Sequence, residues 1–136
     1  MIFTAPEATA ERKAFYQRID REPISNWSRG RVTLLGDAAH PMLQYLAQGA
    51  AMAIEDAYVL ANEVAAAAGD FETAFSKYQQ QRYLRTGRVQ LTARFFGEIY
   101  HAGGATADVR NEIFFKAAPT GKPGESMAWL YDGIAP

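Results

Sequence analysis

The segment at residues 32–37 constrains the fold of this chain more than any other feature. A run of β-branched and leucine residues, Val-Thr-Leu-Leu, leads directly into Gly36 and Asp37. This pattern predicts a buried strand that presents the Asp37 carboxylate at its carboxyl end. Open α/β sheets bind ligands at that end of their strands, and a ligand hydroxyl is the natural partner of a carboxylate. The segment therefore favours an α/β fold with a binding site at Asp37.

The sequence that follows predicts the second half of the same site. An irregular loop leads to Gln48 and Gly49, where an alanine-rich helix is expected to begin. Because Gly49, Ala50 and Ala51 carry no bulky side chain, the free N–H groups of the first turn and the positive end of the helix dipole stay accessible. Such a helix start suits a negative or electron-rich group. We expect the strand, the acid, the loop and the helix start to form one site.

Residues 36–57 resemble the second FAD-binding motif of the single-component flavoprotein aromatic hydroxylases, the family of p-hydroxybenzoate and salicylate hydroxylases. In that family, the aspartate at the position of Asp37 binds the ribityl chain of FAD. The helix start faces the pyrimidine ring of the flavin. The resemblance therefore implies cofactor binding by Gly36, Asp37, Gln48, Gly49, Ala50 and Ala51.

Further segments extend the resemblance over residues 20–133. They are residues 27–31, 97–101, 110–112 and 129–131, together with Tyr78, Arg82 and Arg85. The resemblance implies the carboxyl-terminal portion of an FAD- and NAD(P)-binding aromatic hydroxylase fold. In this chain we expect that portion to be mostly α-helical, with one strand leading into Gly36 and Asp37.

Two positions depart from the commonest form of the motif. Gln44 stands where many members carry proline, and the loop at residues 43–47, Leu-Gln-Tyr-Leu-Ala, resembles that of 3-hydroxybenzoate 6-hydroxylases. The resemblance makes Gln44 the candidate catalytic residue, facing the aromatic substrate, and the alternative is a surface amide. Ala51 stands where asparagine or cysteine is common. The contact expected there is through the backbone N–H, which alanine also supplies.

One element that such an enzyme needs is absent from the sequence. No Gly-x-Gly-x-x-Gly follows a strand in these 136 residues, so the loop that binds the FAD pyrophosphate is missing. Neither residues 103–104 nor residues 121–124 replace it. We expect a single segment, 1–136, of a larger flavoprotein. It divides into a lead at 1–30, the strand, flavin loop and helix at 31–68, and carboxyl-terminal helices and a tail at 69–136.

Apolar spacing predicts the helices of the chain. Residues 50–68 are apolar nearly all round, which predicts a helix buried between other elements. After Gly69 and Asp70, side chains recurring every three to four residues from Phe71 to Tyr100 predict a helix of about 45 Å. Residues 103–104 are expected to end it. Shorter helices are predicted at 8–16 and 108–116, a loop at 118–124, and turns at 20–23 and 28–30.

Charged residues outside the motif have structural interpretations. Glu55 and Asp56 are adjacent on a helix, so their side chains point about 100° apart and cannot act as a carboxylate pair. We expect both to be hydrogen-bond or ion-pair partners. His40 is expected to brace the loop rather than to transfer a proton. A salt-bridged or solvated stripe is expected for Arg82, Arg85 and Arg88, and a core or subunit contact for the aromatic residues at 71–100.

Composition excludes several other functions. The chain is 49% hydrophobic and 21% charged with a formal net charge of −1, so its charge favours neither nucleic acid nor an anionic membrane as a partner. The absence of cysteine excludes disulfides, thiolate nucleophiles and cysteine zinc sites. The spacing of the histidines predicts no metal site. Polar residues appear too early for a signal peptide, no apolar run reaches membrane-spanning length, and we expect a cytoplasmic protein.

The resemblance predicts an FAD-dependent monooxygenase that hydroxylates a small phenolic aromatic carboxylate with O2 and NADH or NADPH. It favours conversion of 3-hydroxybenzoate to 2,5-dihydroxybenzoate, with a salicylate-type hydroxylase as the alternative. The missing amino-terminal part of the enzyme is an expected partner, and the chain alone is expected to be inactive. Exposed apolar surface predicts a homo-oligomer. From another class, a non-catalytic helical module that associates with itself is the alternative.

Overall fold

The computed structural model describes residues 20–117 and 128–131. Its elements are β1 (Ser28–Arg29), β2 (Val32–Thr33), the 3-10 helices η1 (Gly36–Ala38) and η2 (Gln44–Leu46), α2 (Gly49–Ala66), α3 (Phe71–Tyr100), α4 (Gly104–Ala117) and α5 (Ala128–Tyr131). The described residues group into two compact units, one up to Arg94 and one from Phe95 onward, and α3 contributes to both. The predicted helix at 8–16 and loop at 118–124 lie outside the described residues.

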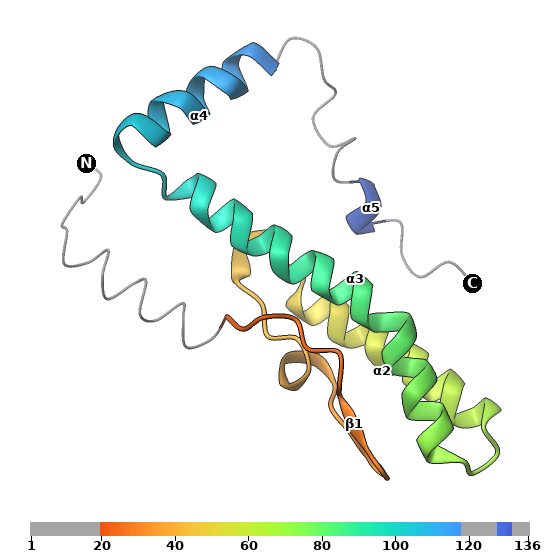
Figure 1. Ribbon diagram of the computed structural model, residues 1–136. Coiled ribbons are helices and arrows are strands. Elements are labelled where there is room, and N and C mark those ends of the chain that lie inside the picture. The colour runs from red at the N-terminus through yellow and green to blue at the C-terminus, as the bar shows by residue number, and fades with distance from the viewer. Residues whose placement is uncertain (1–19, 118–127, 132–136) are drawn as a thin grey trace. The chain divides into compact units, whose positions relative to one another are not determined.

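Two long helices, α2 and α3, carry the first unit and lie side by side (Figure 1). The chain reverses between them at Ala68 and Gly69, whose φ angles are +49° and +101°. Asp70 then caps α3, because its carboxylate accepts hydrogen bonds from the backbone N–H and the hydroxyl of Thr73 at 3.1 and 2.7 Å. The helix break predicted at residues 69–70 and the long helix predicted after it are both confirmed.

The core of the first unit mixes apolar and polar side chains on one face of α3. The buried members of this face are Ala74, Phe75, Tyr78, Arg82, Thr86, Val89, Gln90 and Ala93. From α2, Met52, Asp56 and Val59 are buried, whereas Ile54 and Tyr58 are 72% and 63% exposed. The prediction that α2 is buried on all sides is therefore wrong within residues 20–117 and 128–131. The described residues cover only the face of α2 that carries Met52, Asp56 and Val59.

The strand predicted at residues 32–35 forms half of a short hairpin. β2 pairs antiparallel with β1, and Ser28 lies opposite Thr33 with their hydroxyls 2.8 Å apart. Gly30, with a φ of +57°, lies in the turn between the strands. The turn predicted at 28–30 is present at Gly30, whereas Ser28 and Arg29 form β1. The prediction of a buried strand is wrong, since Val32 is 67% exposed. A two-stranded hairpin can leave one face in solvent, and residues 20–117 contain no other sheet.

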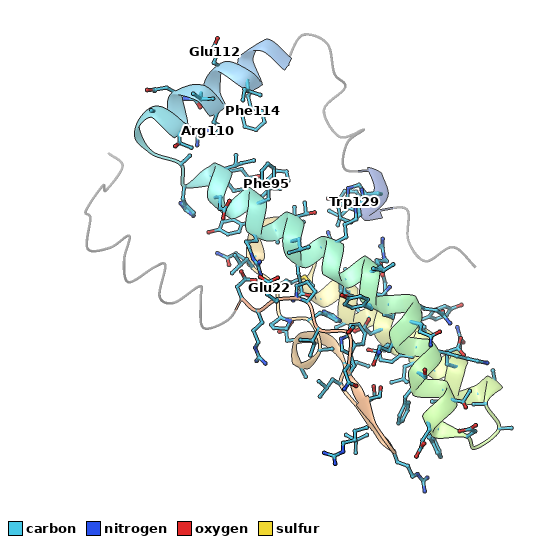
Figure 2. All side chains as sticks on the ribbon, viewed as in Figure 1. Glu22, Phe95, Arg110, Glu112, Phe114 and Trp129 are labelled. Carbon is cyan, nitrogen blue, oxygen red and sulfur yellow. The ribbon has the colours of Figure 1, made fainter. Side chains whose placement is uncertain are left out.

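The second unit begins in the last turns of α3. The rings of Phe96 and Tyr100 contact each other at a tilt of 60°, with centroids 5.6 Å apart. α4 begins at Gly104, before the predicted residue 108, and Arg110 on α4 donates a hydrogen bond to the Ile99 carbonyl at 2.6 Å (Figure 2). Tyr100 is 57% exposed, so the predicted core role of the aromatic stripe holds for the buried Phe75 and Tyr78 and not for Tyr100.

None of the helices in the described part of the chain combines the length and the apolar composition that crossing a membrane requires.

Replacing Gly36 by alanine should destabilise the first unit. Gly36 has a φ of +59°, and a Cβ there would lie 3.2 Å from the Ala53 Cβ. The left-handed conformation costs an alanine about 1 to 2 kcal/mol, so the urea midpoint of unfolding should fall. Gly103→Ala is the matched control, because its Cβ would meet nothing within 4 Å and its φ is not positive. Equal midpoints for the two variants would contradict the strain at Gly36.

Candidate functional site

A groove of about 590 Å³ lies between η1, the loop around η2 and the start of α2. It is lined by Leu35, Gly36, Asp37, Met42, Leu43, Gln44, Ala47, Gln48, Gly49, Ala50 and Ala53. Every predicted site residue except Ala51 belongs to this lining. Ala51 is half-buried, one position further along α2. Residues far apart in the motif are therefore brought together, while their individual roles stay predictions.

The Asp37 carboxylate lies close to the start of α2. A Cβ placed on Gly49 would be 3.9 Å from Oδ1 of Asp37, and Asp37 is itself exposed. The side chain of the N-cap residue, Gln48, makes no capping hydrogen bond to α2, and the first turn of this helix contains no acidic residue. The backbone N–H of Met52 donates to the Gln48 carbonyl at 2.9 Å, and the N–H groups before it have no place in the helical ladder. The groove thus combines a carboxylate acceptor with the donor end of a helix.

A buried carboxylate on α2, Asp56, holds the segment that carries Asp37. Its Oδ2 accepts hydrogen bonds from the Gly36 N–H at 3.1 Å and from His40 Nε2 at 2.5 Å. Its Oδ1 accepts from Arg82 Nε at 2.7 Å. Asp56, His40 and Arg82 are each at most 1% exposed. Since a buried charge is tolerated only when it is paired, these contacts depend on one another. The prediction that His40 braces the loop is confirmed.

Arg82 also joins Asp56 to a second carboxylate, Glu55. Its Nη1 donates to Glu55 Oε2 at 2.6 Å, and its Nη2 donates to the Met52 carbonyl at 3.3 Å. Arg85 adds two parallel hydrogen bonds of 2.7 Å to the oxygens of Glu55. The predicted ion pairing of Glu55 and Asp56 is confirmed. The arginine stripe is salt-bridged at Arg82 and Arg85, but Arg82 is buried rather than solvated.

These contacts decide the ionisation of the cluster. Burial alone raises the pKa of Asp56, but hydrogen bonds from His40 and Arg82 outweigh it and hold the pKa below the usual 3.8. Burial opposes ionisation of Glu55 too, and its hydrogen bonds from Arg85 and Arg82 hold the pKa below 4.5. Burial and the nearby charge of Asp56 raise the pKa of Tyr78, so its hydroxyl remains a donor.

Two side chains of α3 hold the ends of the same loop. The Tyr78 hydroxyl donates to the Leu34 carbonyl at 3.2 Å, and Gln90 Nε2 donates to the Pro41 carbonyl at 2.8 Å. Sequence reasoning missed both contacts. One signal in the sequence could have indicated a role for Gln90. It is a polar residue on the helix face that carries Tyr78, three steps of four residues further along.

Within residues 20–117 and 128–131, no group of histidine, aspartate and glutamate side chains is arranged to hold a metal ion.

Comparison with known proteins decides the family. Residues 7–90, which contain the whole groove, match the family described as an FAD binding domain. The chain belongs to the FAD binding domain family. The predicted resemblance to FAD-dependent flavoproteins is therefore confirmed.

Two curated relatives and one solved structure are similar to this chain over most of its length. It is 50% identical over 112 residues to a 3-hydroxybenzoate 6-hydroxylase of Polaromonas naphthalenivorans, and 51% identical over 113 residues to 3-hydroxybenzoate 6-hydroxylase 1 of Aquipseudomonas alcaligenes. Each match covers 82% of this chain and 28% of the relative. The crystal structure of Klebsiella pneumoniae R204Q HpxO complexed with FAD matches with a TM-score of 0.68 at 31% identity. That match covers 83% of this chain and 29% of HpxO.

The free energy of unfolding should fall on acidification, and Glu55→Gln should reduce this loss. Because the folded-state pKa values of Glu55 and Asp56 lie below 4.5 and 3.8, the unfolded chain takes up protons first as the pH falls. Their stabilisation is complete above these usual values and is lost below them. Urea unfolding between about pH 6 and about pH 3 measures the slope. Glu98→Gln, an exposed position of α3, is the control, and equal slopes for both variants would contradict the prediction.

Proposed function

We propose that this chain is the carboxyl-terminal part of an FAD-dependent monooxygenase that hydroxylates an aromatic ring. The observation that carries the proposal is the groove in which Asp37 lies beside the uncapped start of α2. Membership of the FAD binding domain family supports it. The two relatives named 3-hydroxybenzoate 6-hydroxylase support the reaction class.

The residues of the groove fit the flavin end of FAD. Asp37 supplies a charged acceptor for a ribityl hydroxyl, and the N–H groups at Gly49, Ala50 and Ala51 supply donors for the pyrimidine oxygen and nitrogen. These donors are fixed by the helix and favour negative charge at that end of the ring. When bound, FAD would accept a hydride from NADH or NADPH and would transfer one oxygen atom of O2 to the aromatic ring, with the other oxygen atom released as water.

We propose 3-hydroxybenzoate as the substrate and 2,5-dihydroxybenzoate as the product. Gln44 is exposed and lines the groove, at the position where the resemblance predicts contact with the aromatic substrate. The two relatives named 3-hydroxybenzoate 6-hydroxylase, which are 50% and 51% identical to this chain over the aligned residues, support that choice. A salicylate-type hydroxylase is the alternative that the resemblance leaves open.

The amino-terminal part of such an enzyme is the proposed partner of this chain. The chain spans 28% of the length of the two 3-hydroxybenzoate 6-hydroxylases it matches, and the loop for the FAD pyrophosphate is not in its sequence. The exposed Ile54 and Tyr58 lie on α2, the helix that begins at the groove. We propose that the amino-terminal part covers this face in a cytoplasmic enzyme, and that a second copy covers it when that part is absent.

A hybrid enzyme tests the proposed reaction. In it, this chain replaces the matching segment of the Polaromonas naphthalenivorans relative. We expect the purified hybrid to bind FAD and to oxidise NADH or NADPH faster when 3-hydroxybenzoate is present, forming 2,5-dihydroxybenzoate. The 136-residue chain with added FAD should show no substrate-dependent oxidation. A hybrid that binds FAD but responds only to salicylate would overturn the proposed substrate, and one that cannot bind FAD would overturn the proposed function.

Asp37→Ala should weaken FAD binding by the hybrid. A hydrogen bond to a charged group contributes about 1.5 to 3 kcal/mol, so the dissociation constant should rise roughly ten- to a hundredfold. The fold should survive because the exposed Asp37 side chain has no part in the core. Titration of FAD into the apo-protein measures the effect, with Glu98→Ala as a charge-matched control. If the Asp37 variant binds FAD with unchanged affinity, this groove is not the FAD site.

A further inference from the structure

The cluster of Asp56, His40 and Arg82 is buried next to the groove but does not line it. No atom of these side chains is therefore available to touch a molecule bound there. Their contacts instead converge on the backbone that precedes Asp37 and on the loop that follows it. The cluster is placed to act on the site through that backbone.

The contact with Gly36 is the one that bears most directly on Asp37. Asp56 Oδ2 accepts the Gly36 N–H at 3.1 Å, one residue before the carboxylate that lies in the groove. Gly36 has a φ of +59°, so the chain changes direction at the residue that Asp56 holds. A change in the position of Asp56 therefore alters the peptide plane from which the Asp37 side chain projects.

The contact with His40 fixes the other side of η1. His40 Nε2 donates to the same oxygen of Asp56 at 2.5 Å, and the ring lies 5.5 Å from the Trp27 ring. Its Nδ1 has no hydrogen-bond partner among the described residues, so the bond to Asp56 is the polar contact that orients the imidazole. One carboxylate oxygen thus holds both ends of the segment that contains Asp37.

Arg82 keeps Asp56 in this orientation. Its Nε donates to Oδ1 at 2.7 Å, which leaves Oδ2 for the Gly36 N–H and His40. The planar guanidinium also holds Glu55 and the Met52 carbonyl, so its position is fixed by three acceptors at once. A lysine in its place keeps the charge but cannot satisfy these acceptors together.

We propose that Asp56 and Arg82 are positioning residues of the FAD site, which hold the Asp37 carboxylate in its binding position through the Gly36 N–H and His40. The inference rests on the proposed function, because it takes Asp37 as the acceptor for FAD. Asp56 and Arg82 contribute to affinity only by way of Asp37 and its loop. Their effect on FAD binding is therefore lost when the Asp37 carboxylate is absent.

A double-mutant cycle on FAD affinity tests this coupling. Asp37→Ala, Asp56→Asn and the double variant are made in the hybrid enzyme, and FAD is titrated into each apo-protein. Asp56→Asn alone should raise the dissociation constant about tenfold. In the Asp37→Ala background it should change the constant less than about twofold, whereas independent effects would multiply. Equal factors in both backgrounds, or no effect of Asp56→Asn on affinity, would overturn the inference.

The cycle separates this inference from the proposed function. If Asp37→Ala leaves FAD affinity unchanged, the groove is not the FAD site and the proposed function fails. If Asp37→Ala weakens binding but the Asp56 effect is multiplicative, only the positioning inference fails. Asp20→Asn is the matched control, because Asp20 pairs with Arg94 Nε at 2.7 Å and no hydrogen bond or ion pair described for it reaches the Asp37 loop. It should leave FAD affinity unchanged.

Arg82→Lys keeps the inference testable if Asp56→Asn does not fold. The same cycle with Asp37→Ala should show the same loss of coupling, since lysine keeps the charge but not the three contacts. Amide hydrogen exchange without FAD gives a second readout that does not depend on binding. Exchange at the Gly36 N–H should accelerate in the Arg82→Lys variant and not in Asp20→Asn, and unchanged exchange at Gly36 in Arg82→Lys would overturn the inference.

Discussion

The ion pair between Asp56 and Arg82 is the interaction on which the rest of the first unit depends. A carboxylate with no exposed surface is tolerated only when it is paired and hydrogen-bonded, and here a backbone N–H, an imidazole and a guanidinium donate to it. The three donors come from the loop and from α3, whereas the acceptor is on α2. Satisfying one buried charge therefore fixes two helices and the loop at residues 36–40 relative to one another, and Met52 and Val59 are the buried apolar residues of α2.

The sequence was informative where structure is local. Periodicity and the break at Gly69 and Asp70 predicted α2 and α3, because helix spacing and the capping of α3 by Asp70 depend on neighbours within a turn. The groove was predicted from Asp37 and Gly49, since a strand end and a bare helix start carry recognisable residue types. The resemblance added Gln44, which a reading of periodicity alone would have treated as an ordinary loop amide.

Contacts between distant residues were the part that sequence reasoning could not reach. Nothing in the spacing of Gln90 reveals that its amide binds the Pro41 carbonyl, because that contact depends on how α3 crosses the loop. The hairpin was missed since its strands have two residues each, too few for alternation to show. Ile54 was predicted to be buried but is exposed, for another reason. The apolar character of a helix face predicts that something packs against it, but not whether the packing partner belongs to the same 136 residues.

The helix α3 sets the spacing at which the loop at residues 34–41 is held. The Tyr78 hydroxyl donates to the Leu34 carbonyl, and Gln90 donates to the Pro41 carbonyl. Arg94 pairs with Asp20 and Glu22 at 2.7 and 2.5 Å, so this one helix contacts several separate points of the chain before α2. One residue inserted between Tyr78 and Arg94 would turn everything after it by about 100° and displace it by about 1.5 Å. The number of residues between these side chains is therefore fixed by the contacts that they make. A change in helix length between Tyr78 and Arg94 would therefore break these contacts, whereas a change beyond Arg94, where the second compact unit begins, leaves them in register.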